Sequence, residues 1–250
     1  MIRAMRRNVP VKVAFNNQES LGKLAERMAS QLEPDSVALY VSFTNEPFLK
    51  ENGFTEENIL AMFIPNTYEF YWDVNSNKLA DKMAKEYKKF WNHERLEKAA
   101  AKSLTPIEVS VLASIVHKET AKADERATVA GVYLNRLKTG IPLQADPTII
   151  FAIKKETGDF DQVIKRVYHN DLKIKSPYNT YVNPGLPPGP IAMPDISAID
   201  AVLNAEKHNY IYFCASPDKP GYHAFASNYS EHQVNARKYA AWVNKLGINR

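Results

Sequence analysis

Cysteine is almost missing from this chain of 250 residues, and long apolar runs are missing altogether. The single cysteine, Cys214, excludes an internal disulfide framework and a cysteine-rich metal site. No apolar stretch approaches the roughly 18 residues that a membrane-spanning helix needs. With 45% hydrophobic and 24% charged residues, the composition is that of an ordinary globular protein. A disordered, collagen-like or coiled-coil chain is therefore excluded.

Charge of one sign is only slightly in excess, because the formal net charge is +4. The whole surplus lies beyond residue 100, without a dense Lys/Arg run or a basic stripe interleaved with aromatic residues. Nucleic acid is therefore not an expected partner. The sequence also lacks a cluster of metal ligands at a recognisable spacing and a glycine-rich phosphate loop. We therefore expect neither a metal nor another cofactor.

The pattern of residues 1–75 predicts a small α/β module. Apolar and polar residues alternate over residues 9–15, which is typical of a half-buried strand. Apolar residues then keep helical spacing over residues 21–32, where Pro34 ends the helix. The other elements expected in this module are strands over residues 37–41 and 68–72 and helices over residues 46–52 and 56–62.

The pattern of residues 76–250 predicts a mainly helical domain, so the fold class is α+β. Ser76 is expected to cap a long linking helix that reaches about Lys102. Thr105-Pro106-Ile107-Glu108 has the residues of a helix start with a capping box. The remaining elements are expected as helices over residues 105–120 and 125–137, a short helix from Asp146, a hairpin of strands 210–214 and 222–225, and a helix from Ser230 to about Leu246.

Glu119 occupies an unusual place on the helix that begins after Thr105. Leu112, Ile115 and Val116 form an apolar stripe, and Glu119 is the next residue on it. Burial of a carboxyl raises its pKa, which suits a general acid near neutral pH. The spacing also fits a structural alternative, in which Glu119 lies at the helix end and bonds to Arg126. The spacing alone favours this second interpretation.

The helix that carries Glu119 belongs to one of several ordered blocks that match a known family. The block Ala-Ser-Ile-Val-His-Lys-Glu-Thr, residues 113–120, resembles the signature helix of the YceG/MltG family of endolytic murein transglycosylases, and Glu119 matches the family's catalytic glutamate. Residues 8–13 and 64–68 resemble the latter part of the family's LysM-like module and the segment after it. The other matching blocks are residues 125–126, 130–137, 143–148, 178–181, 185–191 and 223–225.

The resemblance implies a two-part protein with a LysM-like module over residues 1–75 and a catalytic domain over residues 76–250. Two departures from the family stand out. His117 replaces a residue that is usually acidic in the family. The family's N-terminal membrane helix and the start of its LysM-like module have no counterpart here. We therefore expect this chain to be part of a protein that is anchored in the plasma membrane by one helix, with the catalytic domain on the extracytoplasmic, periplasmic side.

The family's reaction cuts the β-1,4 bond between N-acetylmuramic acid and N-acetylglucosamine within peptidoglycan strands. It uses no water and leaves a 1,6-anhydro sugar. The resemblance implies that Glu119 first protonates the glycosidic oxygen and then acts as the base for the sugar's 6-hydroxyl. Peptidoglycan strands are then the substrate, and the resemblance implies peptidoglycan synthases as partners, whose new strands the enzyme would terminate.

The matching blocks also supply candidate residues for binding the substrate. Most have a structural alternative: the amides of Gln144 and Asn179 could bond loop backbone, and Asp146 could cap a helix. Tyr178 and Tyr181 could stack on sugar rings or could be core residues. The stiff Pro-rich segment 184–190 could be purely structural, and the histidine could be a satisfied structural residue. The candidates are Gln144, Asp146, Thr148, Tyr178, Asn179, Thr180, Pro188 and His223.

Two other functions fit the same residues. A glycoside hydrolase would use Glu119 together with Asp146 or Glu125 and would leave a reducing sugar end. A non-catalytic scaffold would bind peptidoglycan through the LysM-like module alone. Product analysis separates the first alternative from a transglycosylase, and cleavage by the wild type excludes the second.

Overall fold

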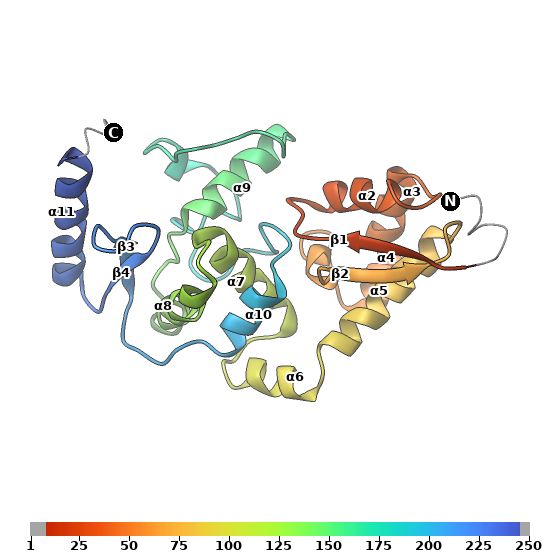
Figure 1. Ribbon diagram of the computed structural model, residues 1–250, viewed down its shortest axis with the longest axis horizontal. Coiled ribbons are helices and arrows are strands. Elements are labelled where there is room, and N and C mark those ends of the chain that lie inside the picture. Colours follow the sequence, from red (N-terminus) through yellow and green to blue (C-terminus); the bar gives the residue numbers. More distant parts are fainter. Residues whose placement is uncertain (1–8, 246–250) are drawn as a thin grey trace.

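The structure is a computed structural model that describes residues 9–245. Along the longest axis of the molecule, residues 9–90 lie towards one end and the helix of residues 229–245 lies at the other (Figure 1). None of the helices in these residues is both long and apolar enough to cross a membrane. The mixture of helices with two small antiparallel sheets confirms the α+β class.

The N-terminal part is built on a two-stranded antiparallel sheet. Strand β1 (Val11–Phe15) pairs with β2 (Asn66–Phe70), and Val13 lies opposite Tyr68. The alternating pattern predicted β1. The second strand was expected over residues 68–72, and β2 begins and ends two residues earlier. The helices between them cover the sheet and are α2 (Leu21–Ala29), α3 (Ser36–Thr44), α4 (Glu46–Asn52) and the 3-10 helix η1 (Ile59–Met62).

The strand predicted over residues 37–41 is wrong, because this segment is helix α3. The Asp35 side chain accepts a hydrogen bond from the Ala38 N–H at 2.7 Å and caps the helix. Leu39 and Phe43, one turn apart, are fully buried in the N-terminal core. Of the helix expected over residues 56–62, only the four residues of η1 are helical.

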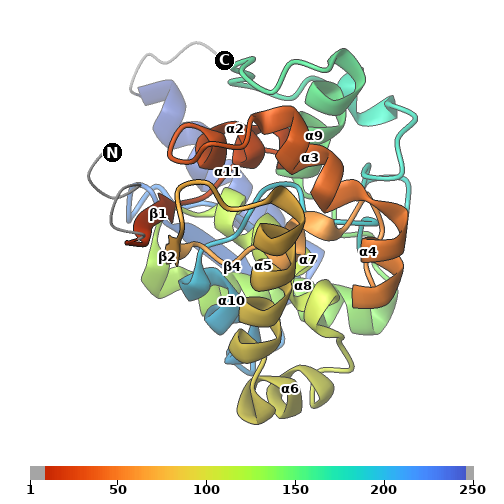
Figure 2. The same ribbon diagram turned by 90° about the vertical axis from the view of Figure 1, so that its right-hand side faces the viewer.

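The long helix predicted from Ser76 to Lys102 is two helices, α5 (Ser76–Phe90) and α6 (His93–Ala100). The sequence pattern missed the break, at which the Asn92 side chain accepts from the Arg95 N–H and caps α6. The cap of α5 is Asn75 rather than Ser76. In Figure 2, α5 lies beside the other N-terminal helices, and α6 projects below them.

The C-terminal part is mainly helical, as predicted. Helix α10 had no sequence prediction. Helix α11 is preceded by Asn228, whose side chain accepts from the Glu231 N–H, so Ser230 is not its cap. The predicted end of this helix near Leu246 lies outside the described residues. The elements are α7 (Pro106–Glu119), η2 (Ala123–Glu125), α8 (Arg126–Thr139), α9 (Asp146–Thr157), η3 (Asp171–Lys173), α10 (Ile196–Leu203), β3 (Tyr212–Ala215), β4 (His223–Ala226) and α11 (Tyr229–Lys245).

Two hydrophobic cores lie along the molecule, one under β1, β2 and helices α2 to α5, the other among α7 to α10. The Pro-rich segment joins them: a Cβ added to Gly189 would lie 1.8 Å from the Glu57 carbonyl oxygen. Nearby, the Met193 N–H donates to the Gln18 carbonyl at 2.9 Å. The domain boundary at residue 75 stays a prediction, and α5, which follows it, packs into the N-terminal core.

Candidate active site

Helix α7 positions Glu119 at its last residue. The helix begins with the predicted capping box, in which the Thr105 hydroxyl and the Glu108 carboxyl each accept from the other's backbone N–H. Its middle turns are fully buried against α8 and α10. Because both the start and the middle of α7 are fixed, the carboxyl at its end has a defined place.

The Glu119 carboxyl is enclosed on one side. Its Oε2 is buried and has no hydrogen-bond partner among the described residues. The hydroxyl of Tyr133, on α8, lies close enough to the carboxyl to favour its charged form. Burial, followed by the negative charge of Asp146, raises the pKa of Glu119 to about 7, against the lowering effects of Tyr133 and Arg136. A substantial fraction of this carboxyl is therefore protonated at neutral pH.

Arg136 supplies a buried positive charge beside Glu119. Its side chain is 7% exposed, and its donors bond to backbone carbonyls instead of a carboxylate. The Nε donates to Ile211 at 2.6 Å, and one terminal nitrogen donates to Leu143 at 2.7 Å. The guanidinium thus ties α8 both to the hairpin and to the loop before α9. Its positive charge also acts to lower the pKa of Glu119 and of Tyr133.

Asp146 lies at the first residue of α9 and faces the same site. The prediction that it caps the helix is wrong, because the cap position is Ala145 and the helix start has no side-chain capping hydrogen bond from the described residues. Instead, Asp146 Oδ1 accepts a hydrogen bond from the Tyr181 hydroxyl. The carboxylate is exposed, and its negative charge raises the pKa of Glu119. The structure therefore brings Glu119, Asp146 and Tyr181 together.

Gln144 stands next to this group with an exposed side chain. Its φ of 50° lies in the left-handed region, which is uncommon for a residue with a Cβ. The backbone is held there because the Gln144 N–H donates to the Thr180 carbonyl at 3.0 Å. The side-chain amide makes no hydrogen bond within residues 9–245. It is thus free to bond a ligand.

Three other predicted binding residues, Thr148, Asn179 and Thr180, are buried beneath the site. The Thr148 and Thr180 hydroxyls lie 2.9 Å apart, and the Thr180 oxygen accepts from the Ala145 N–H. The Asn179 amide donates to two loop carbonyls, and its oxygen accepts from the Tyr181 N–H at 2.9 Å. Their polar atoms are thus occupied, and they fix the backbone that carries Gln144 and Tyr181.

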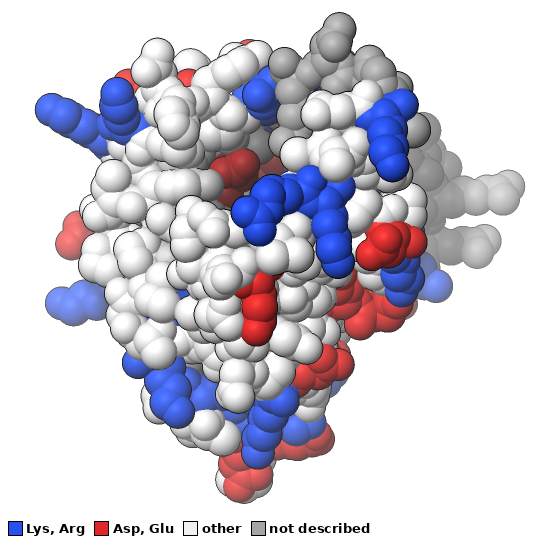
Figure 3. All heavy atoms as spheres, turned by 90° about the vertical axis from the view of Figure 1, so that its left-hand side faces the viewer, with Lys and Arg blue, Asp and Glu red and all other residues white. Residues whose placement is uncertain are grey.

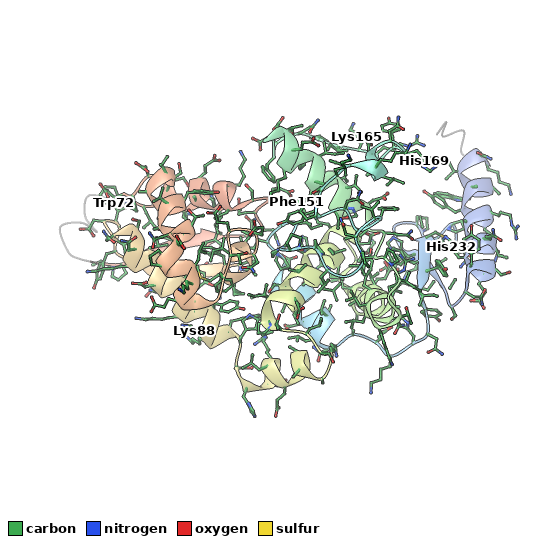
Figure 4. The ribbon with its side chains drawn as sticks, turned by 180° about the vertical axis from the view of Figure 1, so that it is seen from behind. Trp72, Lys88, Phe151, Lys165, His169 and His232 are labelled. Atoms are coloured by element: carbon green, nitrogen blue, oxygen red, sulfur yellow. The ribbon has the colours of Figure 1, made fainter. Side chains whose placement is uncertain are left out.

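Tyr178 and Pro188 lie away from Glu119. The Tyr178 side chain is 1% exposed, and its ring packs 4.6 Å from that of Phe151, which is labelled in Figure 4. Its hydroxyl donates to the Glu57 carbonyl at 3.4 Å, so it joins the two parts of the chain. Pro188 is exposed at a cavity of about 970 Å³ beside the first turn of α7.

His223 forms a buried pair with Glu125. Its Nδ1 lies 2.8 Å from Glu125 Oε2, and its backbone N–H donates to Oε1 at 2.7 Å. The Thr120 hydroxyl also donates to Oε2, at 3.1 Å. This arrangement fastens the hairpin to the residue that follows Glu119, so His223 contributes to the position of the helix end.

Arg126 does not bond to Glu119, so this part of the structural alternative is wrong, although Glu119 does lie at the end of α7 as that alternative stated. Its guanidinium donates to Ser197 at 2.7 Å and to Asp195 at 3.4 Å. His117 Nδ1 lies 3.2 Å from the same Asp195 carboxylate. Burial is the main cause that lowers the pKa of His117. Asp195 thus provides an acidic group on this side of α7, where the sequence itself has His117.

Sequence reasoning missed Tyr133 and Arg136 as members of the site. Both belong to the block at residues 130–137, and they are three residues apart on α8, so they share one face of that helix. An arginine and a tyrosine on an otherwise apolar helix face are a signal that could have indicated a polar site.

Comparisons with known proteins agree with these observations. The sequence model of the YceG-like family matches residues 1–238. The chain is 32% identical over 236 residues to an endolytic murein transglycosylase of Bacillus subtilis (strain 168), and this match covers 92% of this chain and 60% of that protein. An endolytic murein transglycosylase of Streptococcus pneumoniae serotype 2 is 31% identical over 204 residues, covering 82% and 36%. The chain thus spans less than two thirds of these curated relatives.

A crystal structure of a yceG-like protein from Listeria monocytogenes has the same fold. It superposes with a TM-score of 0.73 at 26% sequence identity, and the match covers 93% of this chain and 78% of that one.

Proposed function

Because the chain belongs to the YceG-like family, we propose that it is an endolytic murein transglycosylase. It would cleave the β-1,4 bond between N-acetylmuramic acid and N-acetylglucosamine within peptidoglycan strands and leave 1,6-anhydro ends. The observation that carries this proposal is the Glu119 carboxyl, enclosed beside Tyr133 with its pKa raised to about 7. Such a group can donate a proton and accept one at nearly the same pH.

The proposed reaction needs one carboxyl in two steps. Glu119 first gives its proton to the glycosidic oxygen as the bond from that oxygen to the anomeric carbon breaks. The resulting carboxylate then takes the proton of the 6-hydroxyl as its oxygen bonds to the same carbon. Glu119 ends protonated, and no water is consumed. The nucleophile belongs to the sugar itself, so the protein has to hold the ring and exclude water.

The neighbouring charges suit a carboxyl that is protonated in the first step and ionised between the two steps. Asp146 favours the protonated form of Glu119, which the first step requires. Arg136 and the Tyr133 hydroxyl favour the carboxylate, which exists between the two steps. Both are buried and held by packing, so they stabilise that charge without reorganising.

For substrate contact we propose Gln144, Asp146 and Tyr181, whose polar groups lie beside the carboxyl. Thr148, Asn179 and Thr180 would act beneath them by fixing the loops, and His223 by fixing the end of α7. Tyr178 and Pro188 would act at a distance from Glu119. Tyr178 lies at the junction of the two cores, and Pro188 lies beside the first turn of α7.

Hydrolysis by two carboxylates is the principal rival. Glu125 does not suit the second role, because its oxygens already accept hydrogen bonds from His223 and Thr120. Asp146 is exposed, and among residues 9–245 it is the carboxylate whose charge raises the pKa of Glu119. The two reactions leave different sugar ends, so the products decide between them.

The test is mass spectrometry of the fragments released from purified peptidoglycan. We expect fragments with 1,6-anhydro-N-acetylmuramic acid ends, which are lighter by one water than the fragments left by a hydrolase. Fragments produced in water enriched in ¹⁸O should carry no label at the new end. Labelled reducing ends would show a hydrolase, and an intact polymer would favour the non-catalytic scaffold.

The raised pKa of Glu119 predicts the pH dependence of cleavage. The first step needs the protonated acid, which predominates below about pH 7 and is lost as the pH rises through that value. The initial rate should therefore fall about tenfold per pH unit well above pH 7. Rates measured from pH 5 to 9 at constant ionic strength test this, and a flat profile up to pH 9 would contradict the role of the acid.

The family resemblance also supports a cellular setting. We propose that the activity takes place on the extracytoplasmic side of the plasma membrane, where its substrate lies, in a membrane-anchored protein. Peptidoglycan synthases would be its neighbours, since their nascent strands are the polymer it would cut. Crosslinking in growing cells would test this partnership, and recovery without any synthase would count against it.

A further inference from the structure

We propose that Tyr212, Tyr229 and His232 form a platform that binds a pyranose ring of the glycan strand beside the Glu119 site. These residues come from the hairpin and from α11, and we call them the aromatic platform. The inference rests on the proposed function, because that function makes a glycan strand the ligand. It assigns a binding role to α11, which packs against both strands of the hairpin.

The rings of the platform are in mutual contact. The rings of Tyr212 and His232 have centroids 5.2 Å apart and an interplanar angle of 21°, so they are nearly parallel. Tyr229 lies 6.0 Å from Tyr212 and 6.3 Å from His232. Figure 4 shows His232 on the side of α11 that faces the hairpin. The ring contacts hold Tyr212 and Tyr229 without burying them, which lowers the entropy lost when a ligand binds.

The exposure of these rings distinguishes them from the core. Tyr229 is 60% exposed, and Tyr212 and His232 are half-buried, whereas Tyr133 of the core is 1% exposed. In the part of α11 that the structure describes, Val243 is the buried residue, so this helix contributes little to the core. Large aromatic rings that a fold leaves in contact with water are candidates for ligand binding.

Arg136 lies between the platform and the Glu119 carboxyl. The Arg136 guanidinium carbon lies 5.4 Å from the centre of the Tyr212 ring, and its charge acts on both Glu119 and His232. The same side chain donates to the Ile211 carbonyl, one residue before Tyr212. One guanidinium thus separates the platform from the site. Figure 3 shows the end of the molecule that carries the hairpin and α11, with an acidic side chain inside a hollow and basic ones at its rim.

His232 adds a polar group to the platform. Its Nδ1 is buried and has no hydrogen-bond partner among the described residues. Burial and the charge of Arg136 lower the pKa of this imidazole, which favours the neutral ring. A neutral imidazole offers one donor and one acceptor, which match a hydroxyl or an N-acetyl group.

A β-1,4-linked sugar has the complementary surface. Its ring substituents are equatorial, so the axial hydrogens form an apolar face, and the hydroxyl and N-acetyl groups lie around the edge. A tyrosine likewise presents an apolar ring with a polar tip. Tyr229, the exposed ring of the platform, therefore suits stacking on the sugar face, whereas Tyr212 and His232 support it and offer hydrogen bonds at the edge of the sugar. We assign the platform to a sugar next to the cleaved bond.

The test is binding of glycan strands freed of their stem peptides to the Glu119→Gln protein, measured by isothermal titration calorimetry. In that background, Tyr229→Ala should weaken binding about tenfold, since loss of one aromatic stacking partner weakens the binding of nucleic-acid bases by a comparable factor. Tyr229→Phe keeps the ring and should bind within about threefold of the parent. Tyr71→Ala is the matched control, because Tyr71 is an exposed tyrosine, 46% exposed, in the N-terminal part.

Equal affinities for Tyr229→Ala and the parent would overturn the platform, and so would equal losses in Tyr229→Ala and Tyr71→Ala. Absence of binding to the parent would also count against it. These results are independent of the products released by the wild-type protein. A hydrolase product with the loss in Tyr229→Ala would refute the proposed function alone, and an anhydro product without that loss would refute the platform alone.

Discussion

Replacement of Glu119 by glutamine is expected to lower the rate of strand cleavage about a thousandfold or more. General acid–base catalysis contributes typically ~10²–10⁴ to a rate, and here one carboxyl would serve both proton transfers. Glutamine has nearly the same shape, but it can neither give nor take the proton. Release of anhydro fragments from purified peptidoglycan, followed over time by mass spectrometry, measures the effect.

Glu108→Gln is the matched control for this substitution. Glu108 lies on the same helix, and a glutamine there can keep the capping box of α7. Its cleavage rate should stay within about twofold of the wild type, and both variants should keep the helical circular dichroism of the parent. Cleavage by Glu119→Gln at more than about a tenth of the wild-type rate would mean that another group supplies the proton.

The place of Glu119 could be predicted because it depends on one helix. The capping box fixes where α7 begins, and the apolar stripe continues through Ile115 to the next turn. Local sequence therefore indicated both the element and the half-buried carboxyl. Tyr133 and Arg136 approach Glu119 from a second helix, and their contact depends on how α8 packs against α7. Spacing within one segment holds no information about that packing.

The wrong element at residues 37–41 has a different cause. Val37 and Val41 are β-branched residues, which favour strands, yet they lie exposed on α3. The residues that decide the structure are Leu39 and Phe43, which are one turn apart and fully buried. Tertiary packing and the Asp35 cap thus outweigh a weak strand preference. The missed break before Asn92 is similar, because the composition on both sides of it favours helix.

The candidate binding residues show which part of a binding site side-chain chemistry alone can predict. Asn179 was predicted from its amide, and the structure gives that amide three partners within the fold. Gln144 was predicted for the same reason, and its amide faces solvent. The two residues belong to the same chemical class, and only the tertiary structure separates the satisfied group from the free one.

A substitution at the junction of the two cores should have the largest effect on stability. Gly189→Ala is expected to lower the free energy of unfolding by about 3 kcal/mol or more, because overpacking typically costs ~1–3 kcal/mol even where side chains can yield. Here the new Cβ would lie 1.8 Å from the Glu57 carbonyl oxygen and 2.6 Å from its carbon. These are backbone atoms, which cannot rotate away, so the Pro-rich segment has to separate from the N-terminal part.

Thermal unfolding followed by circular dichroism measures this effect. For a chain of this size, about 3 kcal/mol corresponds to a fall in Tm of ~6–12 °C. Gly22→Ala is the control, because Gly22 lies in helix α2 and its nearest neighbour to a new Cβ, the Ser20 hydroxyl oxygen, is at 3.8 Å. Alanine favours helix over glycine, so this variant should be as stable as the parent or up to ~1 kcal/mol more stable. If Gly189→Ala unfolded at the same temperature as Gly22→Ala, the close contact between the two cores would not contribute to the stability of the protein. The choice of glycine at residue 189 would then need an explanation other than the approach of Glu57.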